Sequence, residues 1–389
     1  MSDRGARPRV IHVITRLIVG GAQLSVISLA EGLSDDFDIQ IIAGPQTGPE
    51  GSLQRCAAAT APLTLVDALR REISPRWDPV AVPALRRLLR RLDADIVHTH
   101  SSKAGIVGRF AAAPLRARAV HTIHGWGHTP ADSRLRRAAF IALERAAARR
   151  CDALLAVSPD NRAEGLAHSI GQPDLYHVIP EPVELEPVVP EFMRGRSQAR
   201  EVLGIDADVE VIGWVGRFVE QKDPDTLARV LIGLLRDRPA SYAVLVGDGP
   251  RRGDVETALA NAELSNRVMF TGVAGSARML MPAFDVLVHP SRWEGQPRVV
   301  QEALAERIPV VSARASGIGQ LIRDGKTGFA VAPHCPEEMV KAATAVLESA
   351  ELRAPLTNSS LDELRSTHGR ATVLDRHREL YNALLKDAR

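Results

Sequence analysis

The sequence predicts an α/β protein built from two domains of similar size. Its 389 residues exceed what one ordinary hydrophobic core supports. Two domains of about 190 residues each would have a usual size. Short apolar runs alternate with segments of helical spacing along the chain, as in parallel sheets whose strands are joined by helices. A proline-rich stretch without periodicity, IPEPVELEPVVPEFM, divides the two halves between residues 177 and 199.

Composition and charge are those of a soluble globular enzyme, with 45% hydrophobic and 25% charged residues. The net charge of +2 argues against a general nucleic-acid binder. Cys56, Cys151 and Cys335 are far apart and lack the spacing of metal ligands, so we expect a reducing, cytoplasmic compartment. The N-terminus lacks the apolar segment of a signal peptide. No run reaches the roughly 18 apolar residues of a membrane span.

The first half of the chain reads as strands that alternate with helices. Apolar runs predict strands at residues 9–14, 39–43, 95–100, 119–123 and 153–157. Gly20 and Gly21 lie between the first strand and a helix over residues 22–33, where they can bring backbone amides against an anion. A glycine pair before a helix is more often a tight turn, so this signal is weak by itself.

Histidines and arginines give the first half its other candidate features. His98 and His100 alternate along the strand 95–100 and therefore point to one side, but no third metal ligand is in sight. His124 follows a strand end, where ligands gather in parallel sheets, although a lone histidine is usually structural. The helix 83–92 carries two arginine pairs on its polar face. This face is either a solvated surface or a contact with anionic lipid or a phosphorylated acceptor.

The stretch from residue 284 to residue 314 concentrates polar residues between two apolar runs. It reads as a strand at 286–289, a loop, a helix at 298–307 and a strand at 308–311. Pro297 suits the first turn of this helix, whose first amides, those of Arg298 and Val299 included, lack intrahelical acceptors. Glu294 in the loop and Glu302 in the helix can address one elongated ligand with its anionic part on these amides. For Glu302, stabilisation of its own helix dipole is an equal alternative.

Two cations follow the strand expected at residues 210–216. Arg217 and Lys222 suit a diphosphate, the first by its guanidinium fork and the second as a point charge. A solvated basic loop is the alternative. Strands at residues 243–247 and 268–272 complete this half. Gly247 belongs to GDGPRRG, which is not a dinucleotide fingerprint because its third glycine comes one residue too late.

Five motifs in this order resemble the family 4 retaining glycosyltransferases, which have the GT-B fold: RLIVGG, HTIHGW, GRFVEQKDP, VMFTG and HPSRWEGQPRVVQEALAERIPVV. The resemblance covers nearly the whole chain. It implies two doubly wound Rossmann-like domains that face each other across a cleft. Residues 1–185 would form the acceptor-side domain and 186–205 the linker. Residues 206–369 would bind the nucleotide sugar, and the helix 370–389 would pack back on the first domain.

The resemblance also implies roles for single residues. Glu294 and His124 would contact the donor sugar, while Arg217 and Lys222 would hold the diphosphate as catalytic cations. Arg16 and His100 would lie on the acceptor side. The donor-binding set would comprise Gly20, Gly21, Gly247, Gln296, Pro297, Arg298, Val299 and Glu302, with the ribose on Glu302. The chain departs from the family at EGQP, where EGFG is commoner, and at Glu181 and Pro182, where asparagine and glycine are usual.

The implied reaction moves a sugar from a nucleoside diphosphate sugar, UDP-linked, to an acceptor hydroxyl with retention. No covalent nucleophile is evident. Front-face transfer therefore fits, with the charge on the leaving phosphate stabilised by Arg217, Lys222 and helix amides. No cofactor or metal is expected, because the aspartate pairs 93/95, 206/208 and 223/225 suit turns and helix starts. The alternatives are a nucleotide-sugar epimerase and a non-catalytic sugar-nucleotide-binding protein.

The sequence leaves the acceptor open among a glycan, a lipid-linked precursor and a small natural product. Nucleic acid is not an expected partner. The basic helix 83–92 leaves open a peripheral contact of the N-terminal domain with the inner face of the membrane.

Overall fold

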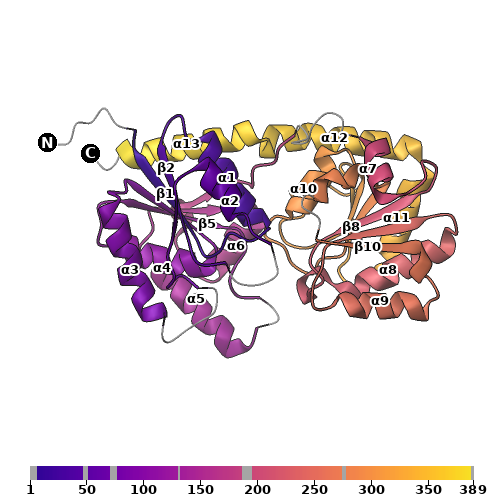
Figure 1. The fold of residues 1–389 in the computed structure, drawn as a ribbon, viewed down its shortest axis with the longest axis horizontal. Coiled ribbons are helices and arrows are strands. Elements are labelled where there is room, and N and C mark those ends of the chain that lie inside the picture. The colour runs from indigo at the N-terminus through magenta and orange to yellow at the C-terminus, as the bar shows by residue number, and fades with distance from the viewer. Residues whose placement is uncertain are drawn as a thin grey trace. The chain divides into compact units, whose positions relative to one another are not determined.

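The computed structural model divides the chain into two compact units, each built around its own sheet (Figure 1). It describes residues 7–46, 51–70, 77–129, 132–185, 195–273 and 277–386. The first unit comprises Met1–Pro182 together with Arg370–Arg389, and the second comprises Val183–Gly369. The chain therefore passes from one unit to the other twice, and the α/β class predicted from the sequence is confirmed for both.

The first unit contains a seven-stranded, entirely parallel sheet with the order β3-β2-β1-β4-β5-β6-β7. The strands are β1 (Arg9–Ile14), β2 (Asp38–Ala43), β3 (Leu63–Leu65), β4 (Ile96–His100), β5 (Arg118–Ile123), β6 (Ala153–Ala156) and β7 (Tyr176–Val178). The chain runs outward from β1 in one direction and resumes at β4 on its other side. The switch point of this sheet lies between β1 and β4, where ligands of such folds usually bind.

Helices cover this sheet, and one of them comes from the C-terminal end of the chain. They are α1 (Gly21–Gly32), α2 (Gln54–Thr60), α3 (Asp78–Arg91), α4 (Ser102–Ala112), α5 (Arg134–Ala148), α6 (Pro159–Ala167) and α13 (Arg370–Lys386). Leu374 and Tyr381 of α13 are buried in the same core as Ile14 of β1. Figure 1 shows α13 beside α1, where Arg370 also bonds to Ser28 and Glu31.

The second unit repeats the plan with a six-stranded parallel sheet in the order β10-β9-β8-β11-β12-β13. Its strands are β8 (Val211–Val215), β9 (Tyr242–Val246), β10 (Val268–Gly272), β11 (Val286–His289), β12 (Val310–Ala313) and β13 (Phe329–Val331). Its helices are α7 (Arg196–Leu203), α8 (Pro224–Asp237), α9 (Arg252–Asn261), α10 (Arg298–Ala305), α11 (Pro336–Glu348) and α12 (Ala350–His368). The switch point lies between β8 and β11.

Burial explains why the strands were readable from the sequence. Strands covered by helices on both faces form continuous apolar runs. β11 and β12 are buried at every position, and β1 is buried at every position after Arg9. Polar side chains interrupt this pattern in the first sheet, where His12, His98, Thr99 and His100 are fully buried and His121 and Thr122 nearly so.

Some boundaries differ from the sequence prediction. Residues 196–203, which we expected within the linker, form α7 of the second unit, where Ala199 and Leu203 are buried. The linker residues 186–194 lie outside the described residues. Pro297 precedes α10 as its N-cap rather than lying in the first turn. Across the described part of the chain, no helix is long and apolar enough to cross a membrane.

Candidate active site

The loops that follow β8 and β11 meet at the switch point of the second sheet. The two strands are parallel neighbours, so their carboxyl ends lie at the same edge. The Arg292 amide donates to the Gln221 carbonyl at 2.8 Å, which ties the two loops together by their backbones. These loops carry Lys222 and Glu294, which the sequence predicted separately as diphosphate and sugar contacts.

Lys222 and Glu294 form a buried ion pair, with 2.5 Å between Lys222 Nζ and Glu294 Oε1. Gln221 Nε2 lies 3.4 Å from the other carboxylate oxygen, Glu294 Oε2. His289 Nε2 lies 3.3 Å from Glu294 Oε1, without ideal hydrogen-bond geometry. These pairings could not be predicted from the sequence, because 72 residues separate Lys222 from Glu294.

This ion pair fixes the charge of Glu294. Burial favours the neutral carboxylic acid, but the attraction of Lys222 and the hydrogen bonds to His289 and Lys222 outweigh it. Together they lower the pKa of Glu294 to about 2. Burial lowers the pKa of His289, so this imidazole is neutral at pH 7. Glu294 is therefore a carboxylate at neutral pH and can accept hydrogen bonds from hydroxyl groups.

Arg217 lies on the exposed start of the β8 loop, beside two glycines whose backbones nearly touch. Gly247 ends β9 with a φ of +135°, and a Cβ added there would lie 1.8 Å from the Gly216 carbonyl oxygen. The Gly247 amide donates to the Gly272 carbonyl at 2.8 Å, at the end of β10. The ends of β8, β9 and β10 are thereby held close together, and Arg217 follows Gly216 directly in the sequence.

Helix α10 begins next to the Glu294 loop and carries the second predicted glutamate. Glu302 accepts a hydrogen bond from Arg298 Nε at 2.9 Å, one turn earlier. Both residues belong to the predicted donor-binding set, and the structure brings them together. No side chain caps α10, and its first amides lack intrahelical acceptors. The start of α10 therefore presents backbone amides beside the Glu294 loop, where the sequence predicted an anion site.

The loop residues around Glu294 are held by buried contacts. Gln296 Nε2 lies 2.7 Å from His368 Nε2 at the end of α12, so the side chain of this predicted donor residue bonds within its own unit. Ser316 donates to the Glu294 carbonyl at 2.7 Å. A Cβ on Gly317, whose φ is +75°, would lie 2.0 Å from the Gly295 carbonyl oxygen. These contacts fix the loop.

Asp223 belongs to one of the aspartate pairs weighed as metal ligands, and the structure shows a structural role. Its carboxylate caps α8 by accepting from the Thr226 amide at 3.4 Å, and it also accepts from the Thr226 hydroxyl at 2.8 Å and from Arg292 at 3.0 Å. Burial raises its pKa, but the hydrogen bonds from Arg292 and Thr226 outweigh this and keep the pKa below its ordinary value. Asp95 similarly accepts from the Arg9 amide at 2.8 Å at the start of the first sheet.

In the first unit, Gly20 and Gly21 stand at the start of α1 as predicted. Gly20 is the N-cap in an extended conformation, and a Cβ there would lie 2.7 Å from Gln23 Oε1. Arg16 is buried, and its carbonyl accepts from Gln23 Nε2 at 3.1 Å. The glycine pair therefore lies against a polar side chain that also secures the loop before α1.

The predicted histidines of the first unit are joined in a hydrogen-bonded chain. His124 Nδ1 bonds to Glu181, and His124 Nε2 lies 3.0 Å from His100 Nδ1. His100 Nε2 lies 3.0 Å from His12 Nδ1. Both ring nitrogens of His124 are thus engaged inside the first unit, and His100 is fully buried, out of reach of an acceptor in this conformation. The sequence analysis did not single out His12, whose only signal is a polar residue within an apolar strand.

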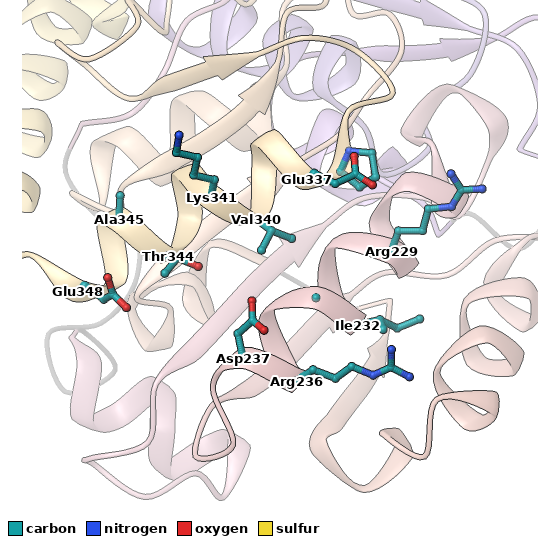
Figure 2. Close-up of a pocket in the computed structure, with 12 residues that line it drawn as sticks. Arg229, Ile232, Arg236, Asp237, Glu337, Val340, Lys341, Thr344, Ala345 and Glu348 are labelled. Atoms are coloured by element: carbon teal, nitrogen blue, oxygen red, sulfur yellow. The ribbon is translucent and has the colours of Figure 1, made fainter.

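A separate groove lies between α8 and α11 and holds none of the predicted site residues. Figure 2 shows Arg229, Arg236 and Lys341 among the acids Asp237, Glu337 and Glu348. The charges of both signs point in different directions rather than toward one centre. We therefore place the candidate site at the β8 and β11 loops and not in this groove.

Comparisons with known proteins show which families and solved structures the chain resembles. Residues 19–187 match the family described as Glycosyltransferase Family 4, and residues 195–361 match the family described as Glycosyl transferases group 1. The chain is 28% identical, over 336 residues, to the UDP-Gal:alpha-D-GlcNAc-diphosphoundecaprenol alpha-1,3-galactosyltransferase of Escherichia coli, covering 85% of this chain and 86% of the relative. It is 30% identical, over 314 residues, to the D-inositol 3-phosphate glycosyltransferase of Saccharomonospora viridis, covering 73% and 70%.

Solved structures share the fold at lower identity. Anabaena HepE, solved in complex with UDP and glucose, superposes with a TM-score of 0.81 at 21% identity, covering 97% of this chain and all of HepE. Sucrose-phosphate synthase from Thermosynechococcus elongatus gives a TM-score of 0.82 at 20% identity, with coverage of 97% and 100%. The two-sheet architecture of this chain is therefore also that of these solved proteins.

Proposed function

Because the chain belongs to the family 4 glycosyltransferases with the GT-B fold, we propose that it transfers a hexosyl group from a UDP-sugar to a hydroxyl group of a lipid-linked acceptor. The transfer retains the anomeric configuration and uses no metal ion. Two findings support the donor and acceptor classes. The galactosyltransferase relative is named for a UDP-sugar and a diphosphoundecaprenol acceptor, and HepE was solved with UDP.

The observation that carries this proposal is the ion pair of Lys222 with Glu294 at the switch point of the second sheet. Lys222, Arg217 of the same loop and the start of α10 suit the diphosphate of a nucleotide sugar. A carboxylate beside them suits the hydroxyl groups of the sugar. When the diphosphate binds, Lys222 can share its charge between Glu294 and a phosphate oxygen, because an ammonium has three donors.

The roles of the residues follow from the negative charge that develops on the leaving diphosphate during transfer. The bond between the anomeric carbon and the phosphate oxygen breaks while the acceptor hydroxyl attacks from the same face. The leaving phosphate oxygen takes the proton of that hydroxyl. Arg217, Lys222 and the first amides of α10 stabilise the negative charge on the departing diphosphate. Glu294 orients the sugar, and Glu302, held by Arg298, accepts from the ribose hydroxyls.

Metal independence is part of the proposal, because side chains and amides supply the positive charge that Mg²⁺ would otherwise bring. Two members of the aspartate pairs are already used structurally. Asp223 caps α8, and Asp95 accepts from the Arg9 amide.

A lipid-linked acceptor agrees with the surface of the first unit. Leu135 and Leu143 of α5 are 83% and 47% exposed on a helix that also carries several arginines. Arg87, Arg90 and Arg91 of α3 are exposed as well. The sequence analysis assigned both arginine pairs of α3 to a polar face, but Arg86 instead packs against α4 and donates to the Phe110 carbonyl at 3.1 Å. Exposed leucines with arginines suit a peripheral contact with an anionic membrane.

The test is a transfer assay with a UDP-hexose and a polyprenyl-diphosphate-linked sugar in vesicles. We expect UDP release only when donor and acceptor are both present, an α-linked product from the α-linked donor, and full activity in excess EDTA. Lys222→Ala and Arg217→Ala should each lower turnover about 100-fold to 1,000-fold, as expected for a lost transition-state donor.

Arg229→Ala removes an exposed cation of the groove between α8 and α11 and serves as the matched control, with unchanged turnover. UDP release without an acceptor product would point to hydrolysis or epimerisation instead. Loss of activity in EDTA that Mg²⁺ restores would refute the metal-free charge assignment. Near wild-type turnover in either site variant would refute the diphosphate clamp.

A further inference from the structure

Four side chains form a hydrogen-bonded chain through the core of the first unit, from Glu181 through His124 and His100 to His12. Each link between the rings measures 3.0 Å, and His124 Nδ1 bonds to a Glu181 carboxylate oxygen. The Ser25 hydroxyl donates to the other oxygen of Glu181. This hydrogen-bonded series crosses the switch point of the first sheet, because His12 lies on β1 and His100 is the last residue of β4.

The side chains of His12 and His100 in this hydrogen-bonded chain are neutral. His12 and His100 are fully buried. Burial, with a smaller contribution from His377, lowers the pKa of His12 to about 3. Burial, followed by the charges of the neighbouring histidines, also lowers the pKa of His100. Each of these two rings therefore carries one proton at pH 7, on one nitrogen only, while the other nitrogen can only accept.

The carboxylate at the end sets the direction of all the hydrogen bonds. Glu181 can only accept, so His124 Nδ1 donates to it. In a neutral His124, Nε2 then has to accept from His100 Nδ1, and His100 Nε2 has to accept from His12 Nδ1. His12 Nε2 is left as a bare acceptor. It is a buried atom without a hydrogen-bond partner among the described residues. If the hydrogen bonds ran in the opposite direction, His12 Nε2 would carry a buried N–H without an acceptor. A buried donor without a partner is rarer in proteins than a buried acceptor without one.

We propose that Glu181 is a positioning residue that holds His12, His100 and His124 in the Nδ1–H tautomer and thereby locks the ring of His124. Both ring nitrogens of His124 are then occupied, so the ring cannot rotate without breaking two hydrogen bonds. This inference goes beyond the proposed function, because it concerns the protein alone and holds whichever donor or acceptor is used.

A metal site is the rival explanation for the same histidines. His12, His98 and His100 each offer a ring nitrogen within 4.8 Å of the others. However, the rings of His98 and His100 are tilted by 36° with centroids 4.2 Å apart, and His100 already uses both ring nitrogens, toward His12 and His124. His98 also uses both nitrogens, toward Tyr381 at 2.5 Å and Thr122 at 2.7 Å.

The experiment is a long-range ¹H–¹⁵N correlation spectrum of the full chain, labelled at histidine, at pH 7 without ligands. Spectra of single His→Asn variants assign the signals. We expect His12, His100 and His124 each to show a protonated Nδ1 and a bare Nε2. A protonated Nε2 on any of the three would overturn the proposal, as would a stoichiometric transition metal in the purified protein.

Glu181→Ala tests the cause of this order. Loss of the carboxylate should convert His124 and His100 from one tautomer to a mixture, whereas a merely space-filling Glu181 would leave the spectrum unchanged. Ser25→Ala is the matched control, because it removes the other hydrogen bond of Glu181 and leaves the ring chain intact. If Glu181→Ala does not fold, the wild-type spectrum decides by itself. Because no donor is present, the outcome does not depend on whether glycosyl transfer is correctly assigned.

Discussion

At the scale of single residues, two ion pairs organise the candidate site. Lys222 was predicted for the diphosphate and Glu294 for the sugar, and the two form one ion pair. Arg298 and Glu302 are joined in the same way. The residue types and their places in loops were predictable from the motifs. The pairing of Arg298 with Glu302 was also predictable, since the two lie four residues apart on one helix. The pairing of Lys222 with Glu294 was not, because it depends on β8 lying beside β11.

The two glutamates should affect ligand binding differently. Glu302→Gln removes a charged acceptor for the ribose and should weaken binding of free UDP by roughly 1 to 3 kcal/mol. Glu294→Gln should leave UDP binding nearly unchanged, since the bare nucleotide has no sugar for Glu294 to hold, while lowering turnover of the UDP-hexose. Isothermal titration calorimetry with UDP measures the first effect, and the transfer assay measures the second.

Glu306→Gln provides the control for this pair of variants. Glu306 follows α10 directly but bonds to Arg278 at 2.6 Å, away from the helix start. Its replacement should leave UDP affinity unchanged. Equal losses of UDP affinity in the Glu294 and Glu302 variants would contradict the assignment of one residue to the sugar and the other to the nucleotide.

At the scale of elements, the strands were the easiest part to predict. The apolar runs at residues 9–14 and 268–272 coincide with β1 and β10. Helix α7 was missed because its sequence, RSQAREVL, is mostly polar. Only Ala199, Arg200 and Leu203 of this helix are buried. Arg200 is a charged residue that the hydrophobic pattern cannot reveal. It is held by Asp285 at 3.0 Å and by carbonyls of the following turn.

The end of β9 supplies a test of how tightly the second sheet holds its loops. In Gly247→Ala, the new Cβ would lie 1.8 Å from the Gly216 carbonyl oxygen, at a φ of +135°. Such strain should lower the free energy of unfolding by about 1 to 3 kcal/mol or more. It should also lower turnover, because the loop that bears Arg217 has to move. Chemical denaturation followed by circular dichroism measures the stability.

Gly253→Ala is the control at a site without these constraints. Gly253 lies in α9, where an added Cβ has no atom within 4 Å. Alanine should stabilise this helix by up to about 1 kcal/mol. A Gly247→Ala variant as stable as Gly253→Ala would show that the close backbone approach at β8 and β9 does not limit the fold.

At the scale of the whole molecule, the sequence predicted two α/β domains and a proline-rich passage between them. The family resemblance named the arrangement that the comparisons confirm as GT-B. A histidine core in one unit could not be foreseen in the same way. It arises because the adjacent parallel strands β1 and β4 and the distant α13 place His12, His98, His100 and His377 on one side of the sheet. No local sequence pattern predicts that histidines from these distant segments meet in one core.

This distribution of histidines predicts that acid loosens the first unit before the second. Six buried histidines have pKa values lowered chiefly by burial, and all lie in the first unit: His12, His98, His100, His121, His128 and His377. Among the described residues, His289 is the second unit's counterpart, and its carboxylate neighbour opposes the shift. Unfolding exposes these rings, which then take up protons near their ordinary pKa of 6.5.

The folded state therefore binds fewer protons than the unfolded state once the pH falls below about 6.5, so stability falls with the pH. Each buried ring contributes at most about 1.4 kcal/mol per pH unit, down to its own lowered pKa. Hydrogen exchange followed by mass spectrometry, corrected for intrinsic rates, should show β4 and β5 losing protection between pH 6.5 and 5. The strands β8 and β11 should stay protected over this range. Simultaneous loss in both units, or earlier loss in the second, would show that the buried imidazoles do not govern the acid stability of this protein.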